Sequence, residues 1–406
     1  MKKTLIAVAA AAALTATSAF AEITFGAWLR VITGVGSNGE DVVMGTTNSW
    51  GGVRPARLNA AGTSEDGKAG FKLDFYFEND EIWDHDKNIR IGDNGYLWVK
   101  PIDQIQLSIG RFDGGETGFR GDFCYGSWNW LRPYNWIVED EGLTFRGSHK
   151  DGLMARITPI DNLVVLVQLP VMNAKWGGNN AGYVAKTETE DAKNTAADVF
   201  KNAAYMASYS IEGVGTLKAG FFGADEEKTV EGKKYNQTGT VNVAFDLNAI
   251  ENLYVTVGAF FDIADKEMGE WHEKMKFTAG ASYQVSDAMK FSVSGGYVKY
   301  MDKCAWLGNK DNAFQIGAGV DYVIMDGLTL NADVRYKNVG YGKKGDDGSV
   351  SFLAGVVKSV GGNASLQAGF QGSTNGCGLV QADTGIPAVE NDDFVWAIPV
   401  GLSVWF

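Results

Sequence analysis

Hydrophobic and polar side chains alternate at every second position along most of the chain. In the segments 241–248 and 253–262 the odd positions carry Val, Phe, Leu or Ala, and the even positions are mostly small or polar. The segments 314–322 and 366–371 show the same alternation with the even positions hydrophobic. Because successive side chains of a strand point to opposite faces, this period predicts β-strands with one apolar face. Segments of about ten residues have the length of tilted strands that span a membrane.

Short and long connections alternate between these segments. The expected short turns lie at 63–68, 101–103, 159–161, 212–214, 248–252, 286–287, 325–327 and 361–362. The longer, mostly acidic connections lie around 34–51, 80–91, 113–141, 171–199, 225–236, 264–273, 301–311, 339–348 and 373–393. Such asymmetry is typical of an outer-membrane barrel and disfavours a soluble β-sandwich. Several aromatic residues also lie on the apolar face near segment ends, where membrane interfaces favour them: Tyr283, Tyr297, Tyr322, Tyr336 and Trp396.

The number of strands follows from the turns. Eight turns, with both chain ends on the short-turn side, imply 18 strands. The segment 142–158 leaves one hairpin open, because 142–149 is a separate short strand, part of a loop or the upper half of one long strand. The expected fold is therefore all-β, a transmembrane antiparallel β-barrel of about 16 to 18 strands, wide enough to leave an aqueous channel.

The first 21 residues are expected to be a secretory signal peptide. Lys2 and Lys3 form a basic start, residues 5–14 are apolar, and Ala19-Phe20-Ala21 is a small-residue cleavage site. The apolar run is shorter than the roughly 20 residues that a spanning helix needs. The expected organisation is a signal peptide over 1–21 and a single outer-membrane barrel over 22–406.

Charge and the scarcity of reactive groups exclude several classes of function. With 36 Lys and Arg against 49 Asp and Glu, the chain is poorly suited to bind nucleic acid. Its three histidines, His85, His149 and His272, lie in or near predicted loops and lack metal-ligand spacing. Ser148 and His149 are adjacent, so on a strand they point to opposite faces and cannot act as nucleophile and base. We therefore expect a protein that is not an enzyme and has no metal site or cofactor.

The three cysteines fall in predicted loops. Because three is an odd number, at least one of Cys124, Cys304 and Cys377 is unpaired. A disulfide between Cys304 and Cys377 and three free thiols are both compatible with the sequence.

The last strand resembles the C-terminal signature of bacterial outer-membrane β-barrel proteins. Hydrophobic residues recur at alternate positions up to a terminal aromatic residue: Phe394, Trp396, Ile398, Val400, Leu402, Val404 and Phe406. The resemblance implies that the barrel assembly machinery recognises the chain end through Phe406. It places the protein in the outer membrane of a Gram-negative-type bacterium, in contact with lipid and lipopolysaccharide.

A second resemblance points to the general diffusion porins. The strand 105–112 ends in the pair Gly110-Arg111 and is followed by a long loop, as in porins where this loop folds inward and constricts the channel. The resemblance implies a homotrimer with passive diffusion of small hydrophilic solutes and ions through water-filled pores.

Assigning the polar face of each strand to the lumen gives a set of pore-lining charges. The early strands contribute the basic residues Arg30, Arg57, Lys72, Arg146 and Arg156, and later strands add Lys218, Lys276, Lys290, Arg335 and Lys337. The inward acids are Asp74, Asp246, Asp262, Asp321 and Asp333. Ionisable groups at this density need water around them, which disfavours a filled barrel. They either create a field across the channel or brace its wall as ion pairs.

The loop 113–141 combines acids with many aromatic residues. If it folds inward, its charges oppose the basic wall, and the candidate constriction residues are Glu116, Asp122, Trp128, Trp130, Glu139 and Asp140. The aromatic rings either pack the loop against the wall or form a stacking track for sugars. The alternatives to a general diffusion channel are therefore a sugar-selective, maltoporin-like channel and a surface adhesin whose barrel displays loops.

Overall fold

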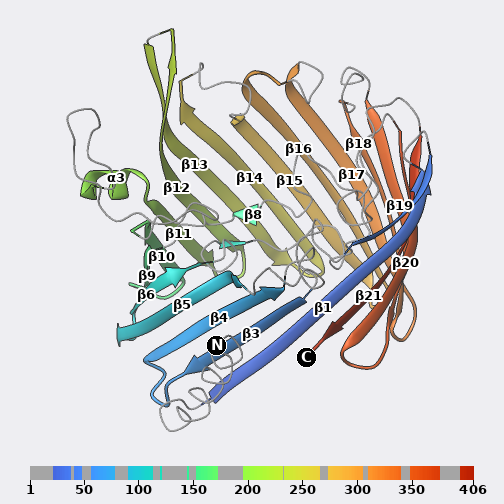
Figure 1. Cartoon of the computed structure of the whole chain (residues 1–406), viewed down its shortest axis with the longest axis horizontal. Helices are drawn as coiled ribbons and strands as arrows, with labels where there is room; N and C mark the ends of the chain where they lie inside the picture. Colours follow the sequence, from blue (N-terminus) through green and yellow to red (C-terminus); the bar gives the residue numbers. More distant parts are fainter. Residues whose placement is uncertain are drawn as a thin grey trace, which may run out of the picture.

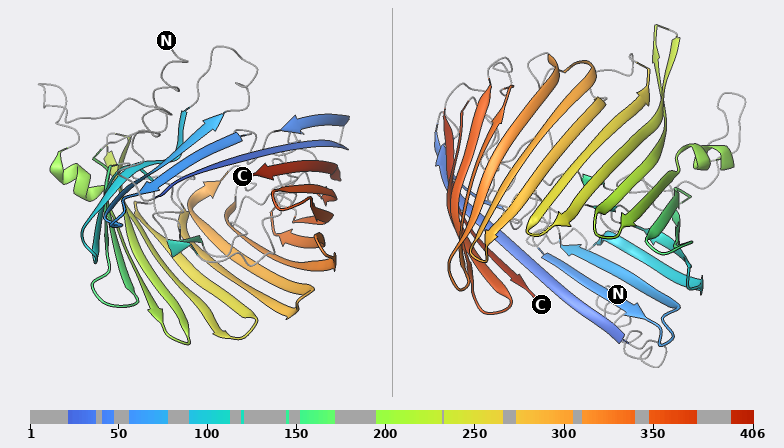
Figure 2. Two further views of the ribbon diagram at one scale, coloured as in Figure 1. Left: turned by 90° about the horizontal axis from the view of Figure 1, so that it is seen from below. Right: turned by 180° about the vertical axis from the view of Figure 1, so that it is seen from behind.

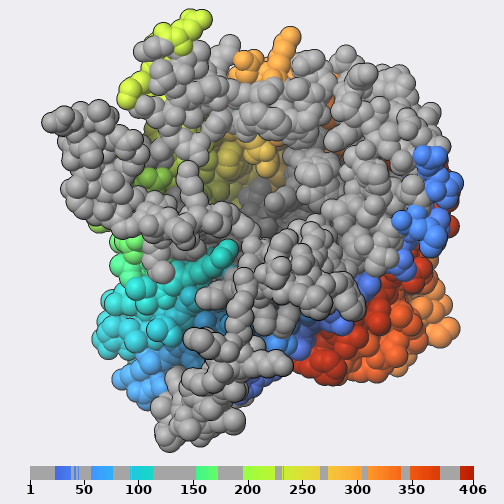
Figure 3. Space-filling view, in the orientation of Figure 1, coloured from blue at the N-terminus to red at the C-terminus, as the bar shows by residue number. Residues whose placement is uncertain are grey.

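Strand β1 (Glu22–Ser37) is hydrogen-bonded along both of its edges, which closes the sheet into a barrel. In the computed structural model of the protein, the described residues are 22–37, 41–47, 56–77, 90–112, 119–120, 144–145, 152–171, 195–231, 233–265, 273–304, 310–339, 348–374 and 394–406. On one edge β1 pairs with β21 (Val395–Trp405), and on the other its lower half pairs with β3 (Ala56–Thr63) and its upper half with β2 (Val42–Thr47). Figure 3 shows the surface of β1 beside that of the last strands.

The remaining wall strands follow in sequence order, each antiparallel to the next (Figure 1). They are β4 (Ala69–Phe77), β5 (Arg90–Ile102), β6 (Ile105–Arg111), β9 (Gly152–Ile157), β10 (Leu163–Leu169), β11 (Ala204–Ile211), β12 (Gly215–Val230), β13 (Lys233–Ile250), β14 (Leu253–Ala264), β15 (Glu273–Ser286), β16 (Met289–Cys304), β17 (Lys310–Met325), β18 (Leu328–Lys337), β19 (Ser349–Ser359) and β20 (Ala364–Ser373). Because β2 and β3 share one position beside β1, the described residues form a closed barrel of 18 strands. This confirms the larger of the two strand numbers expected from the turns.

Tight turns join the strands at one end of the barrel, which we call the short-turn end. All eight turns expected from the sequence lie there in the described residues. The turn after β3 shows how they are held: Asp66 Oδ1 accepts hydrogen bonds from Ser64 Oγ at 2.7 Å and from the Lys68 amide at 3.0 Å. These bonds lower the pKa of the Asp66 carboxyl, with the Ser64 hydroxyl as the largest cause.

The expectation of a loop at 225–236 is wrong. Strand β12 continues to Val230 and β13 begins at Lys233, so this segment is a ladder that stands above the rest of the rim (Figure 1). Its polar composition suggested a loop, but strands that rise above a membrane have water on both faces and need no apolar side. The expected loop at 34–51 is likewise shortened, because β1 and β2 continue their ladder through Ser37↔Val42.

Cys304 is another correction, because it is the last residue of β16 rather than part of a loop. Cys124 and Cys377 lie outside the described residues, so the pairing of the three thiols stays a prediction.

A short helix, α3 (Ala196–Lys201), lies in the connection between β10 and β11. Thr195 and Asp198 form a capping box, in which the Thr195 amide donates to Asp198 Oδ2 at 2.8 Å. The hydrogen bond from the Thr195 amide, and next that from the Thr195 hydroxyl at 2.9 Å, lower the pKa of the Asp198 carboxyl. In the described ranges no helix has the length and hydrophobicity needed to cross a membrane.

The outer face of the barrel carries exposed hydrophobic side chains. Along β21, Ile398, Val400 and Leu402 are exposed, whereas Pro399, Gly401 and Ser403 on the inner face are buried. The chain end completes the closure, since the Phe406 amide donates to the Ala27 carbonyl at 2.9 Å and the Ala27 amide donates to the Phe406 carbonyl at 3.1 Å. The terminal aromatic residue is thus part of the seam.

Candidate functional site in the barrel lumen

The register of the strands assigns the charged residues to one face. Residues paired across antiparallel strands point to the same side, so the inner face can be followed around the closed barrel from Arg30 and its partner Ser403. The charged residues on this face are Arg30, Arg57, Lys72, Asp74, Arg156, Lys218, Asp246, Asp262, Lys276, Lys290, Asp321, Asp333, Arg335 and Lys337. The charges expected in the lumen that fall in described residues therefore share one surface.

The described residues hold only part of the expected site. Arg30 is nearly buried, and Arg57, Lys72 and Arg156 are partly exposed on the inner face. Arg146 lies outside the described residues. The candidate constriction residues also lie outside them: Glu116, Asp122, Trp128, Trp130, Glu139 and Asp140.

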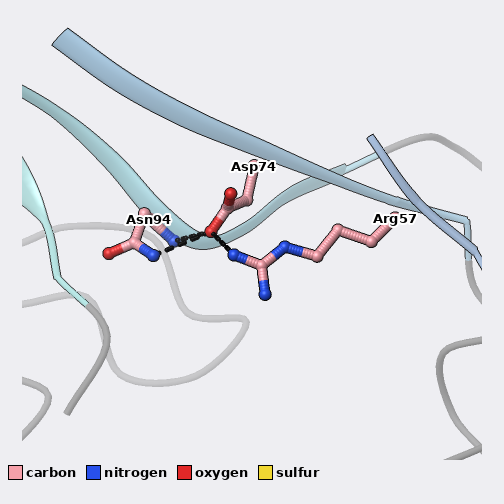
Figure 4. A network of polar contacts seen from close by, with 3 residues as sticks. All are labelled: Arg57, Asp74 and Asn94. Atoms are coloured by element: carbon pink, nitrogen blue, oxygen red, sulfur yellow. Dashed lines mark hydrogen bonds and ion pairs between the residues drawn. The ribbon is translucent and has the colours of Figure 1, made fainter. Parts of the chain in front are cut away.

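Asp74 is the centre of a polar network on the early strands (Figure 4). Its Oδ2 atom accepts a hydrogen bond from Arg57 Nη2 at 2.6 Å. Asn94 donates to the same oxygen through its amide at 3.1 Å and through Nδ2 at 2.8 Å. The Asp74 side chain is completely buried, while Arg57 keeps 31% of its side-chain surface exposed. A bulge beside Asp74 in the pairing of β4 with β5 brings the Asn94 amide to the carboxylate.

A second network lies on later strands. Lys218 of β12 forms an ion pair with Asp246 Oδ2 of β13, and Thr256 of β14 donates to Asp246 Oδ1 at 2.8 Å. All three side chains are buried. Both carboxylate oxygens are thus satisfied, as a buried charge requires. These two networks act as ion pairs that brace the wall.

Other charges on the inner face also have partners close by. Lys276 contacts Glu273 at 2.9 Å and lies 5.9 Å from the centre of the Phe260 ring, while Arg335 lies 3.8 Å from Asp333. In the part of the chain that the structure describes, no group of three His, Cys, Asp or Glu side chains is arranged to hold a metal ion.

The inner face also carries an apolar patch that the sequence did not predict. Buried hydrophobic side chains from β9 to β13, together with Phe112 after β6, form this lumenal patch: Phe112, Met154, Leu166, Ala204, Met206, Phe222 and Ala244. Tyr96 packs against it, with its ring centre 5.1 Å from that of Phe112. One sequence feature could have indicated this patch. In the run 163–167 both the odd and the even positions are apolar, so the residues that face the lumen there are apolar as well as those that face lipid.

A small sheet lies inside the outline of the barrel. Strands β7 (Phe119–Arg120) and β8 (Thr144–Phe145) pair with each other, and β8 lies beside β13 (Figures 1 and 2). Within the segment 142–149 the structure describes residues 144–145, which form a short strand that is not part of the wall. The chain between β6 and β9 therefore enters the space that the wall encloses at the two places where it is described.

Comparisons with known proteins agree with this architecture. The sequence model of the Gram-negative porins matches residues 7–342. Among solved structures, an anion-selective porin from Comamonas acidovorans gives a TM-score of 0.55 at 14% identity, covering 95% of this chain and 99% of that one. OpdL from Pseudomonas aeruginosa gives 0.54 at 11% identity, with coverage of 95% and 99%. At such identities the two structures show a common fold. No curated protein matches the sequence.

Proposed function

Because the chain belongs to the Gram-negative porin family and is an outer-membrane channel, we propose that small hydrophilic solutes and ions diffuse passively through its water-filled lumen. The observation that carries this proposal is the inner face, on which Arg30, Arg57, Lys72 and Arg156 share one surface with the acids. So many ionisable groups need water in the space between them. The outer face is apolar, as lipid requires.

We further propose that the connection 113–151 constricts this channel. The position of β8 beside β13 supports an inward course for it, and the lumenal patch offers a surface on which aromatic rings can pack. On this proposal Glu116, Asp122, Glu139 and Asp140 face the basic wall of Arg30, Arg57, Lys72 and Arg156, while Trp128 and Trp130 pack between loop and wall. Arg146 belongs to the connection itself and adds a positive charge to the pore from that side.

The protein's partners follow from the same family. We propose a homotrimer in contact with lipid and lipopolysaccharide, assembled through recognition of Phe406. The 78% exposure of Phe406 on the outer side of the seam supports access to the assembly machinery.

Single-channel recording in a planar bilayer tests the proposed function. We expect stepwise conductance in groups of three, without block by maltose or longer oligosaccharides. Concentration-dependent block by these sugars would instead favour a sugar-selective channel. A folded protein that gives no conductance would contradict a diffusion channel and favour an adhesin.

A further inference from the structure

Two tryptophans and an arginine lie side by side on the inner face near the short-turn end. Trp28 of β1 has Trp405 of β21 as its register partner on one side and Arg57 of β3 on the other. Arg30 follows two residues after Trp28, on the same face. We call Trp28, Arg30, Arg57 and Trp405 the indole–arginine cluster. All four belong to the described wall, so the cluster is independent of the tryptophans in the loop 113–141.

The cluster is held in place by its surroundings. The Arg30 guanidinium lies 4.8 Å from the centre of the Trp28 ring, and Arg30 Nε donates to Ser403 Oγ at 3.3 Å. The backbone of Trp405 is bonded to Asn363 of the turn between β19 and β20: the Trp405 amide donates to the Asn363 carbonyl at 2.9 Å, and Asn363 Nδ2 donates to the Trp405 carbonyl at 2.8 Å. Such fixed groups bind a ligand with little loss of entropy.

Two members of the cluster present chemistry to the lumen. Trp405 is 38% exposed and offers an indole surface, while Arg57 has 31% of its side chain exposed. Arg30 and Arg57 contribute guanidinium groups, and Arg57 forms an ion pair with the buried Asp74. The cluster therefore combines a flat apolar surface with hydrogen-bond donors that suit an anion.

We propose that the indole–arginine cluster binds sugar acids, which are pyranose rings that carry a carboxylate. The apolar face of a pyranose packs on an indole ring, and guanidinium groups form strong hydrogen bonds with carboxylates. The inference rests on the proposed diffusion of solutes through the lumen, and names a class of solute that is retained on the way.

Saturation-transfer NMR on the refolded protein in detergent micelles tests the inference without relying on conduction. The probes are glucuronate, glucose, acetate and benzoate. We expect glucuronate to bind about tenfold more tightly than any of the other three. If glucose binds as tightly as glucuronate, the carboxylate does not contribute to binding. If acetate binds as tightly as glucuronate, the sugar ring does not contribute. Either result would overturn the proposal. Tighter binding of benzoate would overturn the assignment to sugars.

Matched variants locate the binding site. We expect Trp405→Leu to weaken glucuronate binding about tenfold. Trp396→Leu is the control, because Trp396 lies on the outer face of the same strand; an equal loss in both variants would overturn the site. The double variant Arg57→Gln/Asp74→Asn leaves the net charge unchanged and no buried carboxylate unpaired, but it removes the exposed guanidinium of the cluster. It should therefore reduce the preference for glucuronate over glucose, and an unchanged preference would overturn the role of Arg57.

Conductance measured on the same preparation separates the inference from the proposed function. A conducting channel that binds no glucuronate overturns the inference alone. A protein that binds glucuronate without conducting overturns the diffusion proposal on which the inference rests.

Discussion

Gly110 of β6 and Gly152 of β9 are register partners, and both have a positive φ, 140° and 150° respectively. A side chain at Gly110 would collide with the Gly95 carbonyl, and one at Gly152 with the Leu169 carbonyl. The two glycines thus lie at the end of β6 and at the start of β9, on either side of the connection that contains β7 and β8. Their backbone, which other residues rarely adopt, starts and ends that connection.

We expect Gly110→Ala and Gly152→Ala each to lower the free energy of unfolding by about 1–3 kcal/mol, through backbone strain. Urea titration of the protein in lipid vesicles measures the change. Gly362→Ala is the control, since a side chain there meets open space. A loss in the control as large as in the two variants would contradict a role for the strained backbone.

The wall of the barrel could be predicted from the sequence because its two faces have different solvents. The period of two fixes which residues share a face, so Arg57 on β3 and Arg335 on β18 were assigned to the lumen without knowledge of pairing. The short turns could also be predicted, because they contain Gly and Asn, the residue types that tolerate a positive φ. Gly327 and Asn252 adopt this conformation in the structure. The long connections between strands lack this alternation of apolar and polar residues, so their structure could not be predicted in the same way.

The predictions failed where the two faces of a strand have the same polarity. The ladder at 225–236 was missed because strands above the membrane are polar on both faces. The lumenal patch was missed because Leu166 and Met206 face inward among neighbours that are apolar on both parities. Ion pairs such as Lys218 with Asp246 depend on register between strands, which the sequence alone does not fix.

The pair of Lys218 and Asp246 should be far more sensitive to one substitution than to two. Lys218→Met leaves a buried carboxylate without its cation, and we expect a loss of about 3–5 kcal/mol in unfolding free energy. Lys218→Met/Asp246→Asn removes both charges, while the side-chain amide introduced at position 246 can still accept the hydrogen bond from Thr256, so most of the loss should be recovered. Titration with denaturant measures both variants. Equal losses would show that the wall does not depend on the compensation of charge.

The Asp66 turn should lose its contribution to stability in acid. Since hydrogen bonding lowers the pKa of Asp66 below 3.8, the ionised carboxyl stabilises the fold above this value. That stability is lost as the pH falls through the lowered pKa. Asp66→Asn should therefore be less stable than the parent at about pH 7, and this difference should shrink as the pH falls below 3.8. Thermal unfolding measures the difference, and a difference that does not change with pH would contradict the assignment.

Ion selectivity should depend on salt. Charges at the mouth are screened over about 3 Å at 1 M salt and about 10 Å at 0.1 M, whereas charges in the lumen act on ions at short range. In the described part of the wall, the lumenal face has more basic than acidic residues, while the whole chain has a net charge of -13. We expect a weak preference for anions at high salt that shifts toward cations as salt falls. Reversal potentials in KCl gradients measure it, and a cation preference at high salt would contradict the assignment of faces.

The closed seam also dictates when this protein can fold. Arg30 bonds to Ser403 across 373 positions of the sequence, and Ala27 pairs with the terminal Phe406. The ladder between the first and last strands cannot form until the ribosome has made the final residue. Contacts between such distant residues form slowly, and the facing edges of β1 and β21 are unpaired in the meantime. The barrel therefore closes only after the whole chain has been made, and until then the edges of its first and last strands are open to other partners.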